Sequence, residues 1–251
     1  MASALISYCE DRREDYCEQT NPKVLEELRS GQSGFRNARR VQQSFLASSE
    51  KRILTWIAER TPACINSDHL TLLGFLAQIA AGGFYALSRT NRYCLLAVIA
   101  CLALNWLGDS LDGTLARVRR QQRPRYGFYV DHMVDSFGAL FLMGGLALSG
   151  YMHPYIAVGL FVAFLMLSIQ SYLATYCLGE FHLSFWKFGP TELRLLLSIG
   201  NVALLVHPMV LHGRYRLFDI GGTIGLAGMT VMLLFFTVQN TCRLYHKEPL
   251  R

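Results

Sequence analysis

The sequence has few charged residues for its length. Asp, Glu, Lys and Arg make up only 17% of its 251 residues, while hydrophobic residues make up 52%. An average soluble protein is about a quarter charged. The charges are also unevenly spread, since residues 1–69 carry about half of them and long apolar runs fill most of the remainder. The composition argues against a soluble globular protein and predicts a polar headpiece followed by a membrane domain.

Other features that would indicate a specific class are missing. The seven cysteines are scattered and form no CxxC pair, so the sequence predicts reduced thiols rather than disulfides or a zinc site. No basic stripe interleaved with aromatic residues occurs outside the headpiece, so the net charge of +6 does not indicate nucleic-acid binding. Basic loops beside anionic lipid head groups explain that charge more simply. The first residues lack the apolar core of a signal peptide, so we expect the N-terminus in the cytosol.

Long apolar runs dominate the chain after residue 69. Six can be counted, roughly over residues 70–87, 93–107, 137–150, 156–178, 193–211 and 220–238. A helix needs about twenty residues to cross a bilayer, where every backbone amide must find a partner internally. The second and third runs reach that length only if their helices continue through residues 108–117 and 127–136. The predicted fold is all-α: an integral membrane bundle of six transmembrane helices with an N-terminal amphipathic, cytosolic helical segment.

The basic residues predict the orientation of the bundle. With the N-terminus inside, the inner segments contain the larger set: Lys51, Arg52, Arg60, Arg119, Arg120, Arg123, Arg125, Lys187, Arg243, Lys247 and Arg251. The outer loops contain the smaller set: Arg89, Arg92, Arg214 and Arg216. Because basic residues are retained on the cytoplasmic side, we expect both termini to face the cytoplasm.

The headpiece contains one amphipathic pattern. Apolar residues recur at near-helical spacing among polar ones at Val41, Phe45, Ile53, Trp56 and Ile57. The pattern predicts a helix that lies along the cytoplasmic membrane surface or packs on the inner face of the bundle, and both alternatives stay open. The predicted organisation is a cytosolic segment over residues 1–61, a six-helix domain over 62–242 and a cytosolic tail over 243–251.

One segment, residues 109–136, interrupts the apolar pattern with DSLDGTLARVRRQQRPRYGFYVDHMVDS. If its first part continues the second helix, one face of that helix carries Asp109, Asp112, Gly113 and Ala116. If its last part begins the third helix, one face carries Gly127, Asp131 and Asp135. Two neighbouring helices would then bring four carboxylates to the membrane boundary.

Four carboxylates in such a place repel one another and are costly to desolvate, so they indicate a functional site with a compensating cation. Oxygen-only ligands select hard ions, and no His or Cys joins the pattern at ligand spacing, so Mg²⁺ or Mn²⁺ is expected rather than Zn²⁺. Such a cluster is typical of two ions that clamp the attacking and leaving oxygens around phosphorus. The competing interpretation is a set of helix caps or a solvated helix end.

The segment resembles the signature of the CDP-alcohol phosphotransferases, DxxDGxxAR followed by a spacer and GxxxDxxxD. Every fixed position is present, from Asp109 through Arg117 and from Gly127 to Asp135. The spacer between Arg117 and Gly127 has nine residues, one more than is common in that family. Residues 62–74, PACINSDHLTLLG, also resemble the approach to the family's first helix. The resemblance covers about residues 60–240 and implies six helices, an amphipathic N-terminal helix and an active site facing the cytoplasm.

The resemblance implies roles for these positions. Asp109, Asp112 and Asp131 would be metal ligands, and Asp135 would be both a ligand and the general base on the acceptor hydroxyl. The residues that would bind the CDP-alcohol are Asp112, Gly113, Ala116, Arg117 and Gly127. Elementary chemistry agrees, because an alcohol is a poor nucleophile until a carboxylate takes its proton, and the planar fork of Arg suits a diphosphate. The implied partners are two Mg²⁺ or Mn²⁺ ions, a CDP-alcohol donor, a lipid or small polar alcohol acceptor, membrane lipids and a second copy in a homodimer.

Residues near the predicted fifth helix are candidates for the acceptor site. Lys187, Glu192 and Arg194 flank or follow its start, and relatives with phosphorylated acceptors hold the phosphate with basic residues nearby. The alternatives are snorkelling for the basic residues and helix capping for Glu192. Between the second and third helices, four arginines are interpreted as orientation signals that touch lipid phosphates: Arg119, Arg120, Arg123 and Arg125. His132 is expected to face away from the metals.

Three functions stay open at this stage. The leading one is an enzyme that breaks the diphosphate of a CDP-alcohol, releases CMP and forms a phosphodiester in phospholipid biosynthesis. Six-helix relatives use CDP-diacylglycerol with a small polar acceptor, whereas DHMVDS at residues 131–136 somewhat resembles the choline and ethanolamine phosphotransferases, which use a CDP-aminoalcohol and diacylglycerol. The others are a membrane cation transporter and an inactive lipid-binding scaffold, but Gly, Ala and Arg at nucleotide-binding spacing favour the enzyme.

Overall fold

The computed structural model describes residues 39–41, 47–178, 180–182, 190–210 and 213–247. The chain divides into two compact units, Met1–Arg39 and Arg40–Arg251, and the helices described below all belong to the second. They are α3 (Ala47–Arg60), α4 (Ser67–Leu87), α5 (Cys94–Val118), α6 (Pro124–Ser149), α7 (Pro154–Leu178), α8 (Pro190–Val206) and α9 (Leu217–Lys247). Short strands β1 (Arg39–Val41) and β2 (Glu180–His182) form one sheet, and β3 (Met209–Val210) and β4 (Tyr215–Arg216) form another. The prediction of an all-α fold is confirmed.

Five of the described helices are long and apolar enough to cross a membrane, namely α4, α5, α6, α7 and α9. They coincide with five of the six predicted spans. The remaining predicted span, the fifth in chain order at residues 193–211, contains most of α8, which has only 17 residues. At 1.5 Å per residue this helix is about 26 Å long, less than the ~30 Å of a typical hydrocarbon core. α8 ends at Val206, two residues before Pro208, because proline disfavours a helical conformation in the residue that precedes it.

The two helices that carry the acidic segment include the aspartates, as the length of a membrane span predicts. α5 continues through its aspartates to Val118, and α6 starts at Pro124. Proline suits the first helical turn because its fixed φ matches a helix and its missing N–H would have no partner there. The four aspartates therefore lie within helices, on either side of a short connection. α6 ends at Gly150, whose φ of 81° is the left-handed conformation that often terminates helices.

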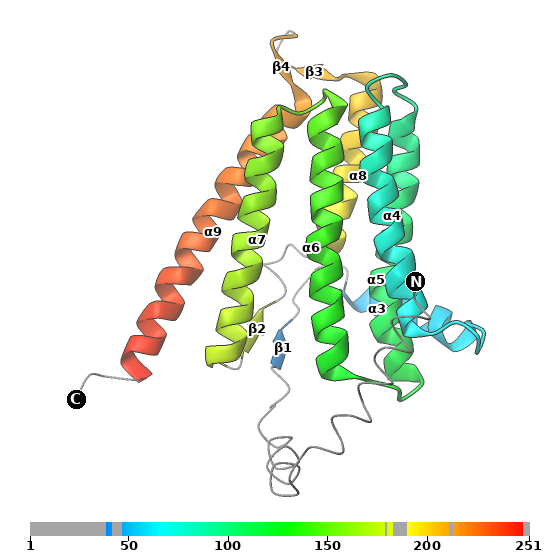
Figure 1. The fold of residues 1–251 in the computed structure, drawn as a ribbon, viewed down its shortest axis with the longest axis vertical. Coiled ribbons are helices and arrows are strands. Elements are labelled where there is room, and N and C mark those ends of the chain that lie inside the picture. The colour runs from blue at the N-terminus through cyan, green and yellow to red at the C-terminus, as the bar shows by residue number, and fades with distance from the viewer. Residues whose placement is uncertain (1–38, 42–46, 179, 183–189, 211–212, 248–251) are drawn as a thin grey trace, which may run out of the picture. The chain divides into compact units, whose positions relative to one another are not determined.

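The helices α4 to α9 run alongside one another (Figure 1). α4 packs on α5 and α6, α6 packs on α7, α7 packs on α9, and α8 packs on α5. Short connections reverse the chain between successive helices from α4 to α7. As a result, the first turns of α4, α6 and α8 lie at the same end of the bundle as the last turns of α5. The acidic segment is at this end.

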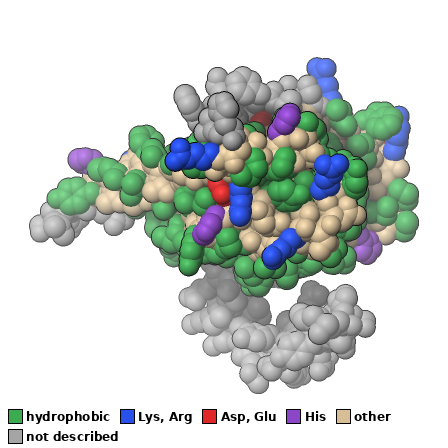
Figure 2. Space-filling view, turned by 90° about the horizontal axis from the view of Figure 1, so that it is seen from above, with side chains coloured by type: hydrophobic (Ala, Val, Ile, Leu, Met, Phe, Trp, Pro, Cys, Tyr) green, Lys and Arg blue, Asp and Glu red, His purple; other side chains and the backbone are tan. Residues whose placement is uncertain are grey.

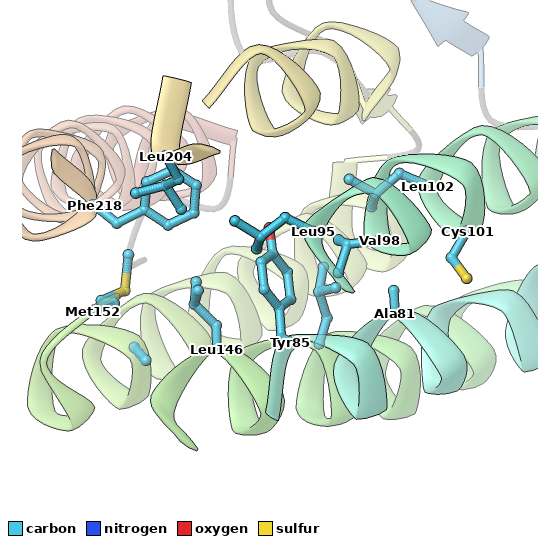
Figure 3. Packing of buried hydrophobic residues seen from close by; sticks show 12 residues of the cluster. Ala81, Tyr85, Leu95, Val98, Cys101, Leu102, Leu146, Met152, Leu204 and Phe218 are labelled. Atoms are coloured by element: carbon cyan, nitrogen blue, oxygen red, sulfur yellow. The ribbon is translucent and has the colours of Figure 1, made fainter. Parts of the chain in front are cut away.

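The opposite half of the bundle contains the main apolar core. Its fully buried side chains include Tyr85, Leu95, Val98 and Leu146, which come from α4, α5 and α6 and pack together as Figure 3 shows. Met152, Leu204 and Phe218 extend this core towards α7, α8 and α9. Because lipid tails are as apolar as these side chains, the core stabilises the bundle through close packing between the helices.

Charged side chains are scattered over the end face beside the β3–β4 hairpin. Figure 2 shows several Lys or Arg side chains on this face, with an acidic side chain and His side chains, among apolar and uncharged ones. Arg89, Arg92 and Arg214 are exposed at the connections of this end, as predicted for one end of the bundle. These isolated charges contrast with the acidic segment at the other end.

The amphipathic helix α3 packs on the bundle. Leu54 and Ala58 are buried against Leu70, Leu111 and Leu115 of α4 and α5. On its other side, Ile53 and Trp56 are 53% and 58% exposed, which leaves an apolar edge that suits a membrane surface. The predicted start of this helix was wrong. Val41 lies in β1, where a β-branched residue is favoured, and the helix begins at Ala47, while Phe45 is outside the described residues.

Candidate active site

All four aspartates of the acidic segment line one cavity. Asp109 and Asp112 approach it from α5, and Asp131 and Asp135 approach it from α6. Its volume is about 10 Å³, which is room for about one water molecule. The rest of its lining consists of Thr71, Gly74, Phe75, Asn105 and Val134. The helical spacing of the aspartates thus places carboxylates from two neighbouring helices around one point.

Asp109 forms an ion pair with α8. The Nη2 atom of Arg194 donates to Asp109 Oδ2 at 2.6 Å, and its Nε atom donates to Asn105 Oδ1 at 2.7 Å. The side chains of Arg194 and Asp109 are only 15% and 26% exposed, so solvent screens this charge-assisted pair incompletely. Asn105 also donates from Nδ2 to the carbonyl oxygen of Gly74 at 3.0 Å. The guanidinium is therefore held in position on two sides.

Asp112 is held by α4. Thr71 Oγ1 donates to Asp112 Oδ2 at 2.6 Å, and the backbone N–H of Gly113 donates to the other carboxylate oxygen. Ser67 Oγ donates to the backbone carbonyl oxygen of Asp112 at 3.0 Å. Two hydroxyls from the first turns of α4 thus fix both the main chain and the side chain of this aspartate.

The facing aspartates of α6 complete an acidic environment. Asp131 and Asp135 are half-buried, and the carboxylates of Asp109, Asp112 and Asp131 repel the charge of Asp135 while Arg194 attracts it. Like charges this close need a compensating cation. Arg194 compensates part of this negative charge.

The chemistry of the donor set fits a hard divalent ion, because every donor is a carboxylate oxygen. Among the described residues, however, no three Asp, Glu, His or Cys side chains are arranged to hold one ion. Contacts to Arg194 and Thr71 occupy oxygens of Asp109 and Asp112. Ion binding at this cavity would therefore exchange those contacts for metal ligation.

Of the five residues predicted to bind the nucleotide, Asp112 lines the cavity and the other four do not. A Cβ atom added at Gly113 would meet only Arg117 Nη1, at 3.8 Å, and one added at Gly127 would meet nothing within 4 Å. Arg117 is exposed and donates from Nη2 to Thr114 Oγ1 at 3.0 Å. Ala116 is half-buried on the same helix. These four positions lie on the same two helices as the aspartates, α5 and α6, outside the lining of the cavity.

The three predicted acceptor residues have different surroundings. Arg194 reaches the site, as its ion pair with Asp109 shows. Glu192 is half-buried on α8 and is not among the residues that line the cavity. Lys187 lies outside the described residues.

Two arginines between α5 and α6 make protein contacts that the sequence interpretation missed. Arg119 Nη2 donates to the carbonyl oxygens of Thr61 and Pro62, both at 2.9 Å. Arg123 pairs with Asp68 Oδ2 at 2.6 Å, and this carboxylate raises the pKa of the Arg123 guanidinium. These contacts tie the α5–α6 connection to the α3–α4 connection. Arg120 and Arg125 are exposed.

His132 packs beside α7. Its ring centroid lies 4.1 Å from that of Phe128 and 4.8 Å from that of Tyr172. It is not among the cavity-lining residues. This placement agrees with the expectation that His132 faces away from the aspartates.

Three polar residues near the site were not identified from the sequence. Asn105 could have been, because it is a polar residue in an apolar run and precedes Asp109 by one helical turn. Thr71 lies within the segment that resembles the family's first helix, yet nothing there indicates its contact with Asp112. Glu50 accepts a hydrogen bond from Ser110 Oγ at 3.2 Å, and no local pattern could predict a contact across 60 residues.

Comparison with known protein families gives a match over most of the chain. The family model described as CDP-alcohol phosphatidyltransferase matches residues 65–239. This match includes the four aspartates, the helices α4 to α8 and most of α9. A comparison with curated proteins gives no match. Because the matched region is well over half of the sequence, the chain belongs to the CDP-alcohol phosphatidyltransferase family.

Proposed function

We propose that the chain transfers a phosphoalcohol group from a CDP-alcohol to an acceptor alcohol and releases CMP, in phospholipid biosynthesis. The observation that carries this proposal is the convergence of four carboxylates from α5 and α6 on one cavity. Family membership supports the same reaction class, because the family is one of CDP-alcohol phosphatidyltransferases. A cation transporter would not need the open glycines and exposed arginine beside that cavity.

Two divalent ions, Mg²⁺ or Mn²⁺, are proposed to bind Asp109, Asp112, Asp131 and Asp135. Divalent metal use is a property of the family. When bound, such ions supply positive charge that stabilises the diphosphate oxygens and the departing CMP. Without the ions, Thr71 and Arg194 hold the carboxylates of Asp112 and Asp109 through the contacts that metal ligation would replace.

Asp135 is the proposed general base. The acceptor hydroxyl oxygen forms a bond to the phosphorus that carries the alcohol group, the phosphorus–oxygen bond to CMP breaks, and the hydroxyl proton passes to Asp135. A carboxylate surrounded by other carboxylates favours taking up a proton, because protonation relieves their repulsion. Asp135 has three such neighbours.

The nucleotide is proposed to lie over the open mouth of the site. Gly113 and Gly127 leave space there that any larger side chain would fill, and Ala116 keeps the same helix face small. Arg117 would pair with the diphosphate through its planar fork. Asp112 borders both this region and the cavity.

The proposed donor is CDP-diacylglycerol, with a small polar acceptor held by Arg194, Glu192 and Lys187. Arg194 is already at the cavity, where an acceptor phosphate would attract its guanidinium away from Asp109. The same proposal has six membrane crossings, one of which is α8. It places both termini and the site on the cytoplasmic side. A homodimer and the cytosolic character of residues 1–61 and 243–251 are part of the same proposal.

A turnover assay tests the reaction. Purified protein in lipid nanodiscs with Mg²⁺ is given CDP-diacylglycerol with a panel of polar alcohols, or CDP-aminoalcohols with diacylglycerol, and CMP release is measured. We expect Asp135→Asn to keep its thermal unfolding temperature but to lose CMP release by about a hundredfold or more. Asp219→Asn is the matched control, since Asp219 lies in the first turn of α9 at the opposite end. Turnover by Asp135→Asn at the wild-type rate would refute the base assignment.

A further inference from the structure

The carboxylate of Glu50 connects three helices. Its Oε1 atom accepts hydrogen bonds from Trp106 Nε1 at 2.8 Å and Ser110 Oγ at 3.2 Å on α5, and from Thr191 Oγ1 at 3.1 Å on α8. Glu50 itself belongs to α3. Three donors from two helices thus meet on one oxygen, and an ionised acceptor makes each of these bonds stronger than a neutral acceptor would.

The two partners of Glu50 on α5 and its partner on α8 lie beside the ion pair of the site. Ser110 directly follows Asp109, and Thr191 precedes Arg194 by three residues, which is about one helical turn. Arg194 and Asp109 are the residues that join α8 to α5 within the site. Glu50 therefore bridges the same two helices at nearly the same level, from outside the cavity.

The packing of α3 fixes the position of Glu50. Leu54 and Ala58, one and two turns further along α3, are buried at 5% and 3% exposure against α4 and α5. α8 has no comparable apolar contact with α3 among the described residues, and it packs mainly on α5. The hydrogen bond from Thr191 to Glu50 therefore joins the first turn of α8 to α3, whose place the apolar contacts fix.

We propose that Glu50 is a positioning residue, which holds the first turns of α8 against α5 so that Arg194 stays aligned with Asp109 and the acceptor. This inference rests on the proposed function for its effect on turnover. Misplacing a substrate-positioning group by about 1 Å can cost about a hundredfold in rate. Glu50 does not line the cavity, so its effect passes through Thr191 and Arg194.

A double-mutant cycle tests this path. We expect Glu50→Ala to lower kcat/KM about tenfold and Arg194→Gln to lower it about a hundredfold, with the double variant no worse than Arg194→Gln alone. Glu50→Gln keeps the acceptor oxygen without its charge and should lose clearly less than Glu50→Ala. Glu59→Ala, an exposed glutamate on the same helix, is the matched control and should also stay near wild type. A double variant whose loss is the product of the two single losses would overturn the proposal, as would a loss in Glu50→Gln equal to that in Glu50→Ala.

A second measurement does not depend on turnover. Hydrogen–deuterium exchange of peptides covering residues 190–200 should become faster in Glu50→Ala and stay unchanged in Glu59→Ala. If the wild-type protein released no CMP from any donor, the proposed function would fail, but faster exchange would still show that Glu50 holds α8. Unchanged exchange in Glu50→Ala would refute the positioning role whatever the activity.

Discussion

Two pairs of glycines, one in each half of the helix bundle, have different surroundings. In the apolar half, Gly82 of α4 and Gly145 of α6 allow the two helices to touch, since a Cβ at Gly145 would overlap the carbonyl oxygen of Gly82 and a Cβ at Gly82 would overlap that of Phe141. At the acidic end, Gly113 and Gly127 have no close neighbour. Small residues at helix contacts are the usual means of close packing in membranes, whereas Gly113 and Gly127 leave the space that we propose for the nucleotide.

The polar side chains follow the same division. In the apolar half the polar contacts are internal, as in the 2.9 Å bond from Asn201 Nδ2 to Tyr85 Oη. At the acidic end, ionisable groups from α5, α6 and α8 converge on a cavity. The apolar half therefore stabilises the fold, and the acidic end holds the charged groups to which we assign the function. Variants at each end should separate stability from activity.

The largest expected effect is that of metal removal on the acidic end. Chelating divalent ions should lower CMP release by at least about a hundredfold, because the carboxylates would lose the cations that make the diphosphate reactive. The thermal unfolding temperature should also fall, because ions that bind only the folded state stabilise it and the carboxylates repel one another without them. Activity should return on adding Mg²⁺ or Mn²⁺. CMP release that persists in excess chelator would contradict the metal assignment.

Gly145→Leu should destabilise the apolar half of the bundle. The new side chain would push α6 away from the backbone of α4, so we expect a loss of about 3 kcal/mol in the free energy of unfolding. The measurement is thermal unfolding of the purified protein in detergent. Gly144→Leu is the matched control, because a Cβ at Gly144 meets nothing within 4 Å. Equal stability of the two variants would show that the close approach of α4 and α6 is not needed.

Gly113→Leu should affect the open end without harming the fold. Leucine favours a helix over glycine by up to about 1 kcal/mol, so the unfolding temperature should hold or rise. The side chain would occupy space proposed for the nucleotide, so KM for the CDP-alcohol should rise about tenfold or more. Initial rates across a range of donor concentrations measure this, with Gly144→Leu as the control. An unchanged KM would place the nucleotide elsewhere.

Arg123→Ala should have the smallest effect. The ion pair with Asp68 is about half exposed, at 54% and 49% for the two side chains, and exposed pairs contribute about 0–1 kcal/mol. We expect a change in unfolding temperature of a few degrees or less, and it should shrink further in high salt. A loss similar to that of Gly145→Leu would mean that the α5–α6 connection supports the fold as strongly as the apolar half does.

Much of the fold follows from local pattern. The apolar runs predicted the long helices, and the spacing of Asp109 and Asp112, and of Asp131 and Asp135, predicted two acidic helix faces that now line one cavity. The length requirement of a membrane span predicted that α5 and α6 extend through their aspartates, which they do. The errors lie at helix ends, where β1 replaces the expected start of α3 and α8 stops before Pro208.

The sequence by itself determined the all-α fold, the acidic helix faces and the small residues beside them, because hydrophobic periodicity and helical spacing act over a few neighbouring residues. Only the tertiary structure decided that Arg194 pairs with Asp109, that Thr71 orients Asp112 and that Glu50 joins α3 to α5 and α8. These contacts span 41 to 141 residues of sequence. They depend on how whole helices pack, so no local pattern encodes them.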